Sequence, residues 1–224
     1  MKRNPSLRKL SARQIPALAA RQKGFTLIEL SIALAIVSVL IVGSLIGVQR
    51  ILANNRANNL LAEVPRINAA LVGAAVNSSN FASITTKKAA ALGAFSPNTV
   101  KWENDTPTVS NAFGGSLYIQ GNDSNMDGVG GKDRGYIVVA TGIPTDMCAT
   151  VVNGLAPLAQ VLWVDAPATQ ATPANFDQPL TSAPAATDMI KGPDATSAIN
   201  IDKLAERCRG GNSNTRVVYA FVPL

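Results

Sequence analysis

Residues 24–48 read GFTLIELSIALAIVSVLIVGSLIGV, and this stretch decides how the rest of the chain is interpreted. Between Phe25 and Val48 the single charged residue is Glu29. An α-helix needs about 20 apolar residues to cross a bilayer. A helix packed in a soluble core would show a polar stripe, which this run lacks. No second run of this kind occurs in the sequence, which therefore predicts one membrane-spanning helix.

The segment in front of this run, residues 1–24, is basic. It holds seven of the 20 Lys and Arg side chains and none of the 14 Asp and Glu side chains, so the rest of the chain is nearly neutral. Clusters of Lys and Arg beside an apolar run stay in the cytoplasm, which sends the C-terminal body outside. The body lacks the basic stripe that nucleic acid requires, and we expect no nucleic-acid site. The alternative to a targeting leader is a flexible basic tail.

Three kinds of segment share these features: a cleaved secretory signal, an uncut signal anchor, and an anchor processed in front of its apolar run. A cleaved signal has an apolar core of about 7–15 residues and then a small-residue cleavage site. This run is longer, and Gln49 and Arg50 follow it directly. A carboxylate such as Glu29 costs about 2.5–3.5 kcal/mol in hydrocarbon and usually has a partner. A new α-amino group at Phe25, on the same or a neighbouring subunit, would supply one; otherwise Glu29 lies in the headgroup zone.

The residues from Lys23 to Leu30, KGFTLIEL, resemble the prepilin peptidase site of type IV pilins. The resemblance implies cleavage between Gly24 and Phe25, methylation of the new N-terminus at Phe25, and a role for Glu29 in directing subunits into a growing filament. The 24-residue leader is similar to that of the type IVb class, which includes bundle-forming, toxin-coregulated and conjugative thin-pilus pilins. Phe25 is a departure, because type IVb pilins often begin with another apolar residue.

The resemblance implies an α+β fold, the pilin ladle, in which a long membrane-spanning N-terminal helix packs on an antiparallel sheet and a disulfide bounds the C-terminal region. Three parts are expected: a cleaved leader at 1–24, a long helix at 25–80 whose part 25–48 spans the membrane, and an exported α+β head at 81–224. Beyond the membrane part, apolar residues return at spacings of three and four, which predicts a helix to about residue 79. Pro65 is expected to interrupt it.

Strand-like runs separated by turns favour an antiparallel sheet in the head. The expected strands are residues 108–112, 116–120, 136–141, 160–165 and 215–222. The last of these is apolar on both faces, which is typical of a central strand.

Two short helices are expected in the head, one at residues 86–92 and one from about 145 to Asn153. Gly154 is expected to end the second helix, because glycine is common just after a helix. Residues 166–198 contain five prolines among Ala, Thr and Ser, which predicts a long irregular surface loop.

Cys148 and Cys208 flank this loop and are the only cysteines of the sequence. An even cysteine count in an exported domain predicts a disulfide. The loop-entropy model gives about 4 kcal/mol of stabilisation for closing about 60 residues. The resemblance agrees, because pilins commonly bridge two C-terminal cysteines around a variable region. A reactive thiol and an intermolecular bridge are the alternatives.

One segment has the opening pattern of a calcium loop: Asp123, Asn125 and Asp127, followed by Gly128. Position twelve of the loop, however, is Arg134 instead of glutamate. Asp, Asn and Gly are also the usual residues of a hairpin turn. We expect the turn, with calcium as the alternative and no other cofactor.

The sequence lacks histidine, which excludes Ser-His-Asp triads and His-containing zinc sites. Together with this exclusion, the resemblance to type IV pilins implies a structural pilus subunit and no enzyme. Such a subunit begins as a single-pass precursor in the bacterial inner membrane and ends in an extracellular pilus. Its expected partners are copies of itself, prepilin peptidase and the inner-membrane pilus assembly machinery. One alternative is a pseudopilin or minor pilin of a type II secretion or DNA-uptake machine, and another is a monomeric membrane-anchored enzyme or binding domain. Adhesion, conjugation, aggregation and motility all fit a pilus subunit.

Overall fold

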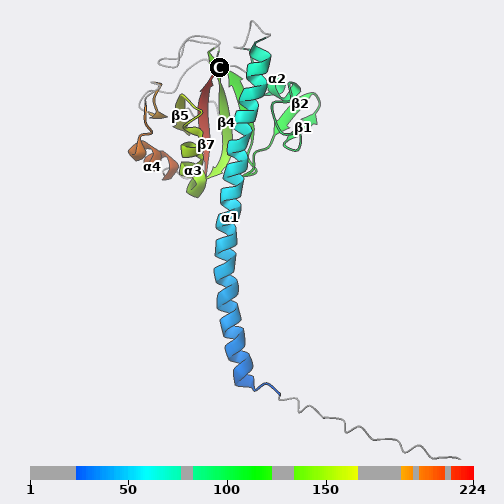
Figure 1. Cartoon of the computed structure of the whole chain (residues 1–224), viewed down its shortest axis with the longest axis vertical. Coiled ribbons are helices and arrows are strands. Elements are labelled where there is room, and N and C mark those ends of the chain that lie inside the picture. The colour runs from blue at the N-terminus through cyan, green and yellow to red at the C-terminus, as the bar shows by residue number, and fades with distance from the viewer. Residues whose placement is uncertain (1–23, 77–82, 123–133, 166–187, 194–196, 210–212) are drawn as a thin grey trace, which may run out of the picture. The chain divides into compact units, whose positions relative to one another are not determined.

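The computed structural model describes residues 24–76, 83–122, 134–165, 188–193, 197–209 and 213–224 (Figure 1). The chain divides into two units, Met1–Ile46 and Gly47–Leu224. The helix α1 (Leu27–Ala75) contributes to both units. In the first unit every described residue of α1 is exposed.

In the second unit, α1 buries one face. Its buried residues recur at spacings of three and four, which is the pattern of a helix packed along one side: Ala57, Leu60, Val64, Ile67 and Leu71. The predicted helical stripe is therefore confirmed, although the helix ends at Ala75. Pro65 lies on the exposed side, and the helix continues on both sides of it.

A five-stranded sheet forms the centre of the second unit, with every neighbouring pair antiparallel. Its strand order is β3 (Leu117–Gly121), β4 (Gly135–Pro144), β7 (Thr215–Pro223), β5 (Val161–Val164) and β6 (Met189–Lys191). The central place of β7 is confirmed. The edge strand β6 corrects the prediction that residues 166–198 are irregular throughout, and residues 166–187 and 194–196 lie outside the described part of the chain.

Both faces of the sheet are buried, which explains why β7 is apolar on both sides. One face packs with α1, α3 (Thr145–Leu155) and α4 (Ile201–Arg209) in the larger hydrophobic cluster. The other face forms a second cluster, in which the rings of Trp163 and Tyr219 stack with centroids 5.3 Å apart. Successive residues of β4, β5 and β7 therefore pack alternately into the two hydrophobic clusters.

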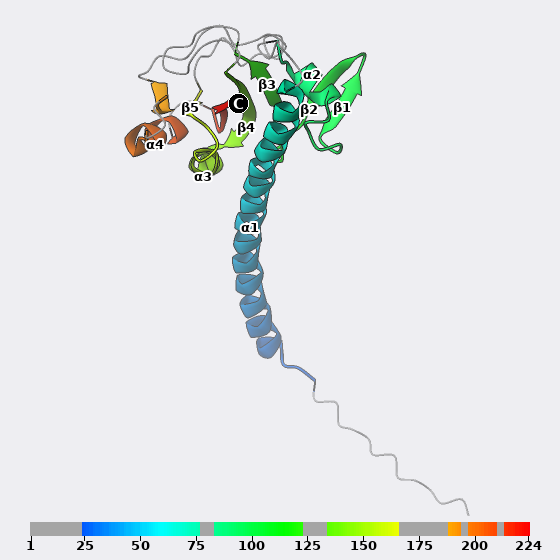
Figure 2. The ribbon, with the colours of Figure 1, turned by 45° about the horizontal axis from the view of Figure 1, so that its top comes forward.

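A separate two-stranded hairpin, β1 (Val100–Glu103) and β2 (Thr106–Val109), lies beside α2 (Thr86–Ala91) in both views (Figures 1 and 2). The turn residues Asn104 and Asp105 both have positive φ, which Asn and Asp tolerate better than most residues. Lys87 of α2 forms an ion pair with Asp105 and so fastens the turn to the helix. The expected helix at 86–92 is confirmed, whereas β1 was not predicted.

The end of α3 corrects the prediction for Gly154. The helix runs through this glycine to Leu155 and is followed by Ala156 in helical conformation. A Cβ at Gly154 would overlap the Leu61 side chain of α1. The glycine therefore lets α3 approach α1 closely, and it does not end the helix.

Substituting Gly115 is expected to destabilise the head. A Cβ at this position would overlap the backbone oxygen of Thr141, so the backbone of β4 would have to shift. Overpacking of this kind costs about 1–3 kcal/mol, and we expect Gly115→Ala to lower the free energy of unfolding by this amount. Urea unfolding followed by tryptophan fluorescence measures it.

The control for this experiment is Gly73→Ala on α1, where no heavy atom lies within 4 Å of the added Cβ. Gly73 lies in the last turn of α1, so the change is expected to stabilise by less than the roughly 0.5–1 kcal/mol that applies in mid-helix. Equal stability of the Gly115→Ala variant and the unmodified chain would contradict the close approach.

Two buried tyrosines predict how the head responds to alkaline pH. Burial raises the pKa of Tyr136 above its usual range; burial and the Asp165 carboxylate raise the pKa of Tyr219 to about 12. An unfolded tyrosine titrates near pH 10, so the unfolded chain loses its protons first as pH rises. The stability that these two residues contribute is complete below about pH 10 and falls above it.

We expect tyrosinate absorbance to rise cooperatively, together with loss of far-UV circular dichroism, when the pH exceeds about 10. In Tyr136→Phe the amplitude of this step should fall. Titration of Tyr136 and Tyr219 near pH 10 while the circular dichroism stays unchanged would contradict their burial.

Candidate functional site

The bond between Gly24 and Phe25 lies in front of α1. Residues 24–26 have no regular secondary structure, and Phe25 is 87% exposed. A peptidase must bind its substrate in an extended form, and an exposed, non-helical bond meets that need. The predicted cleavage and methylation residues therefore lie together, one residue before the N-cap of the helix.

Glu29 caps the start of α1. Its Oε2 accepts hydrogen bonds from the backbone N–H and the hydroxyl of Thr26, at 3.0 and 2.9 Å. In return the Thr26 hydroxyl oxygen accepts from the Glu29 N–H at 3.3 Å. This reciprocal pattern is a capping box, formed by a Thr and the Glu three residues later. It places the carboxylate of Glu29, the predicted assembly residue, at the N-terminus of α1, beside the backbone of Thr26.

The apolar part of α1 is uncovered in the isolated chain. The most apolar 18-residue window has a mean hydropathy of 2.6, and none of it is buried. Within the described residues, α1 is the single helix long and apolar enough to cross a membrane. A helix that is apolar all round is expected to lie in lipid or among other helices. We therefore expect the apolar surface of residues 27–48 to be covered by lipid or by other helices.

Three serines lie within this apolar run, and each donates its hydroxyl hydrogen to a carbonyl of its own helix. The acceptors are Ile28 for Ser31, Ala35 for Ser38 and Leu40 for Ser44, at 2.7–2.8 Å. An unsatisfied hydroxyl is costly in hydrocarbon. These bonds explain why the serines do not break the apolar character of the helix.

The two cysteines form the predicted disulfide. Cys148 of α3 is bonded to Cys208 of α4, with their Cα atoms 5.5 Å apart. Because both cysteines are used, the alternatives of a reactive thiol and an intermolecular bridge are excluded in this structure. The bond joins two helices that pack on the same face of the sheet.

The calcium alternative falls on residues that the structure does not describe, because Asp123, Asn125 and Asp127 all lie within 123–133. The strands on either side of it, β3 and β4, are antiparallel neighbours, and the expected turn also lies outside the described residues. Among the described residues, no group of three or more Asp, Glu, Cys or His side chains could hold a metal. The calcium alternative therefore stays a prediction.

A cavity of about 520 Å³ lies between α1 and the chain that leads into and out of the β1–β2 hairpin. Glu63 of α1 lines it and accepts a hydrogen bond from the Ser96 N–H at 3.3 Å and another from the Ser96 hydroxyl. Arg66 donates to the same hydroxyl oxygen at 3.0 Å. The polar groups at this cavity thus fasten the loop at Ser96 to α1.

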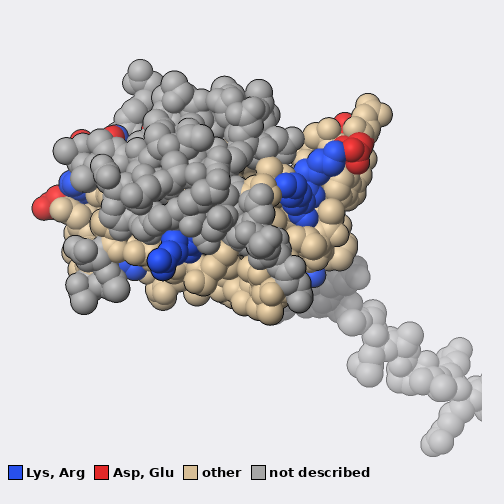
Figure 3. Space-filling model, turned by 90° about the horizontal axis from the view of Figure 1, so that it is seen from above, with Lys and Arg blue, Asp and Glu red and all other residues tan. Residues whose placement is uncertain are grey.

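Charged side chains on the face seen in Figure 3 lie in separate small groups, and one basic group adjoins acidic side chains. On that face the described residues form no continuous basic stripe, which a nucleic-acid groove would need.

Comparisons with known proteins bear on both units. A family model described as the prokaryotic N-terminal methylation motif matches residues 19–45. No curated protein sequence matches the chain significantly. Among solved structures, a type IVb pilin from Salmonella typhi is similar over 74% of this chain and 99% of that chain, with 13% identity and a TM-score of 0.50. TcpA, a type IV pilin from Vibrio cholerae El Tor biotype, covers 75% of this chain, with 98% of its own length, 15% identity and a TM-score of 0.49.

The family model and the Salmonella typhi structure agree with the geometry. The motif covers the cleavage region, the Glu29 cap and most of the apolar run. The structural likeness shows the fold, a long helix on an antiparallel sheet with a disulfide in the C-terminal region. The chain thus joins the prokaryotic N-terminal methylation motif to a fold similar to that of a type IVb pilin.

Proposed function

We propose that the chain is a structural subunit of a type IV pilus, a filament built from many copies of one pilin. The observation that carries this proposal is the apolar, uncovered first part of α1, headed by the Glu29 cap and followed by a pilin head. Copies of the same helix would cover one another in the filament core. This makes a structural role the best account of the chain, in place of an enzymatic one.

Maturation would begin with prepilin peptidase cutting between Gly24 and Phe25, and the new amino group of Phe25 would then be methylated. The methylation motif at residues 19–45 and the exposed, non-helical bond support these steps. The basic leader would hold this bond at the cytoplasmic face of the inner membrane until cleavage. The mature chain would then pass from the membrane to an extracellular pilus through the assembly machinery.

Glu29 would set the axial position of each subunit. Cleavage creates a positive amino group at Phe25, and the Glu29 carboxylate of a neighbouring copy would pair with it among apolar helices. Opposite charges attract more strongly where water is excluded. A subunit displaced along the filament axis would leave both charges unpaired in hydrocarbon, which is unfavourable. The apolar surface would supply the affinity, and the charge pair would supply the register.

Mass spectrometry of two fractions tests the proposal: filaments sheared from the cell surface, and membranes. We expect an abundant chain in the sheared fraction that begins at Phe25 and carries one N-terminal methyl group. The same mature chain confined to membranes would favour a pseudopilin or minor pilin. A chain that still begins at Met1 would contradict maturation and would favour a monomeric membrane-anchored domain.

A further inference from the structure

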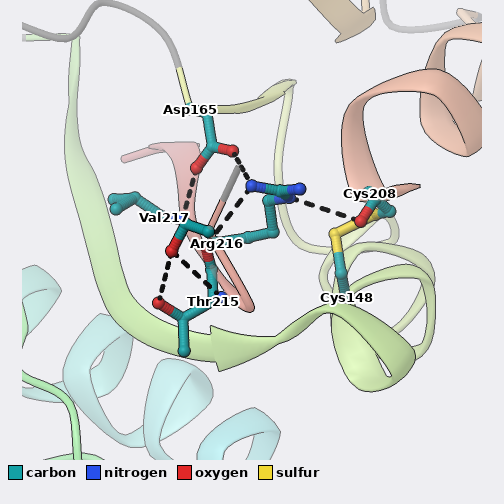
Figure 4. A network of polar contacts seen from close by, with 7 residues as sticks. Cys148, Asp165, Cys208, Thr215, Arg216 and Val217 are labelled. Carbon is teal, nitrogen blue, oxygen red and sulfur yellow. Dashed lines mark hydrogen bonds and ion pairs between the residues drawn. A yellow bond between two sulfur atoms is a disulfide. The ribbon is translucent and has the colours of Figure 1, made fainter. Parts of the chain in front are cut away.

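Arg216 lies in the central strand β7, yet its side chain is buried, with 3% of its surface exposed. Its Nη1 forms an ion pair with Asp165 Oδ2 at 3.1 Å, and its Nε donates to the Cys208 carbonyl at 3.3 Å (Figure 4). Nη1 also lies 3.4 Å from the carbonyl of Thr215. One guanidinium thus connects the end of β5, the end of α4 and β7.

Asp165 is held in place independently of this arginine. It follows β5 directly and has a φ of 57°, a conformation that few residues other than glycine adopt. Its Oδ1 accepts from the Val217 N–H at 2.8 Å, and its own N–H donates to the Val217 carbonyl at 2.9 Å. These bonds to β7 fix the carboxylate that faces Arg216.

Cys208 is the next-to-last residue of α4, so its carbonyl is one of the four that a helix leaves without an internal partner. A cation near a helix C-terminus is favourable, because the helix dipole is negative there. Arg216 bonds the backbone of Cys208 and does not use its sulfur. The contact is therefore available whether or not Cys208 is oxidised.

A purely stabilising role explains this arginine poorly. Its Nη2 is buried and has no hydrogen-bond partner among the described residues. Replacing a buried ion pair by apolar side chains is often neutral for stability. A guanidinium can also orient the groups that it binds, because its planar, forked arrangement of donors holds two acceptors in a fixed position relative to each other. Those two groups are Asp165 and the backbone of a disulfide cysteine.

We propose that Arg216 is a positioning residue for the disulfide: it holds Cys208 beside Cys148 in the folded, reduced chain and so favours their pairing. With oxidised glutathione as the oxidant, one cysteine thiolate attacks a glutathione sulfur and releases one glutathione thiolate. The second cysteine thiolate then attacks the mixed disulfide and releases the other. The protein loses two electrons and two thiol protons, and one oxidised glutathione becomes two reduced ones.

The test measures the equilibrium constant between the protein disulfide and glutathione. The full-length chain in detergent is equilibrated in glutathione buffers, its thiols are trapped by alkylation, and the two forms are counted by mass. Because Arg216 orients the reduced cysteine, we expect Arg216→Met to shift this equilibrium toward the dithiol by about tenfold. Arg216→Lys should show an intermediate shift, because an ammonium cannot bond both groups in a fork.

Arg207→Met is the matched control. Arg207 lies on the same helix α4, forms an ion pair with Asp188, and is bonded neither to Cys208 nor to Asp165 in any described contact. Its removal is expected to leave the disulfide equilibrium within about twofold of the unmodified chain. A shift as large as that of Arg216→Met would overturn the proposal, because it would assign the effect to α4 in general.

Urea unfolding of both redox forms separates positioning from general stabilisation. If Arg216 only stabilised the fold, its replacement would weaken the reduced and oxidised forms equally and leave the glutathione equilibrium unchanged, which would overturn the proposal. If the reduced Arg216→Met chain does not fold, Asp165→Asn takes its place. The amide oxygen of that variant keeps an acceptor for Val217, and loss of the charge alone should still shift the equilibrium toward the dithiol. No shift in Asp165→Asn would also count against the proposal.

Discussion

Glu29→Val is expected to leave processing at Gly24 intact and to reduce the amount of the chain in surface filaments by about a hundredfold or more. The reason is that the new amino group of a neighbouring Phe25 would be left without its anion among apolar helices. An uncompensated buried charge of this kind costs about 3–5 kcal/mol. Quantitative immunoblotting of sheared and membrane fractions measures the loss, and mass spectrometry measures the N-terminus.

The matched control is Ser31→Val on the same part of α1. It introduces the same side chain into the apolar run, and the bond that it removes goes to a carbonyl of its own helix. We expect this variant to assemble normally. Normal filaments from Glu29→Val would contradict a role for the Glu29 carboxylate in assembly. A Glu29→Val chain that keeps its leader would show instead that Glu29 acts at cleavage.

Removing the disulfide is expected to have the largest effect on the stability of the head. The bond closes a sequence separation of 60 residues between two helices on one face of the sheet. In the loop-entropy model this closure contributes about 4 kcal/mol. The double variant Cys148→Ala, Cys208→Ala should lose about this much free energy of unfolding, measured with urea and followed by far-UV circular dichroism. Alanine is chosen because both positions are buried and a serine hydroxyl would need a partner there.

Reduction of the unmodified chain is the internal control for this variant. A reducing agent should move its unfolding midpoint to that of the double variant, since both lack the same link. Unfolding that is unchanged by both treatments would show that the packing of α3 and α4 alone holds this region.

The parts of the fold that were predicted from the sequence are those with a strong local signal. An uninterrupted apolar run predicts the first part of α1, and a one-sided apolar stripe from Ala57 to Leu71 predicts the second part. β7 was predicted to be central because alternate residues are apolar on both faces, and the structure has a core on each side. Glu29 stands out as one charge in an apolar run, and its role in assembly stays a prediction. These patterns lie in consecutive residues, so they can be recognised without knowing the tertiary structure.

The parts that were missed depend on contacts between distant residues. β6 has three residues, too few for any period to be visible, and exists because it pairs with β5. The helix α4 is a different case, because Ile201, Leu204, Ala205 and Cys208 recur at helical spacing and could have predicted it; Leu204 and Cys208 are the residues that it buries. Gly154 has the composition of a helix stop, and only the nearness of Leu61 gives it another role.

Arg216 shows the same limit at a polar site. Nothing in the run TRVVYAFV indicates that its one charge is buried, because alternation alone would place it on either face. Its ion-pair partner Asp165 is 51 positions earlier, and the sequence predicted it only as the end of the strand at 160–165. In the structure β5 ends at Val164, Asp165 follows with a left-handed backbone, and the contacts of its carboxylate are visible only there.

The uniform surface of the first part of α1 has a consequence for the mechanics of a filament. Its exposed apolar side chains occupy every side of the helix, and the serines present no unused hydrogen there. Burial of apolar surface therefore favours no particular rotation of the helix about its own axis. One helix can turn in this way against its neighbours at little cost in free energy. In the proposed filament, the Glu29 carboxylate in the first turn of the helix would oppose sliding along the axis. A fibre built in this way should yield to torsion more readily than to changes in subunit rise.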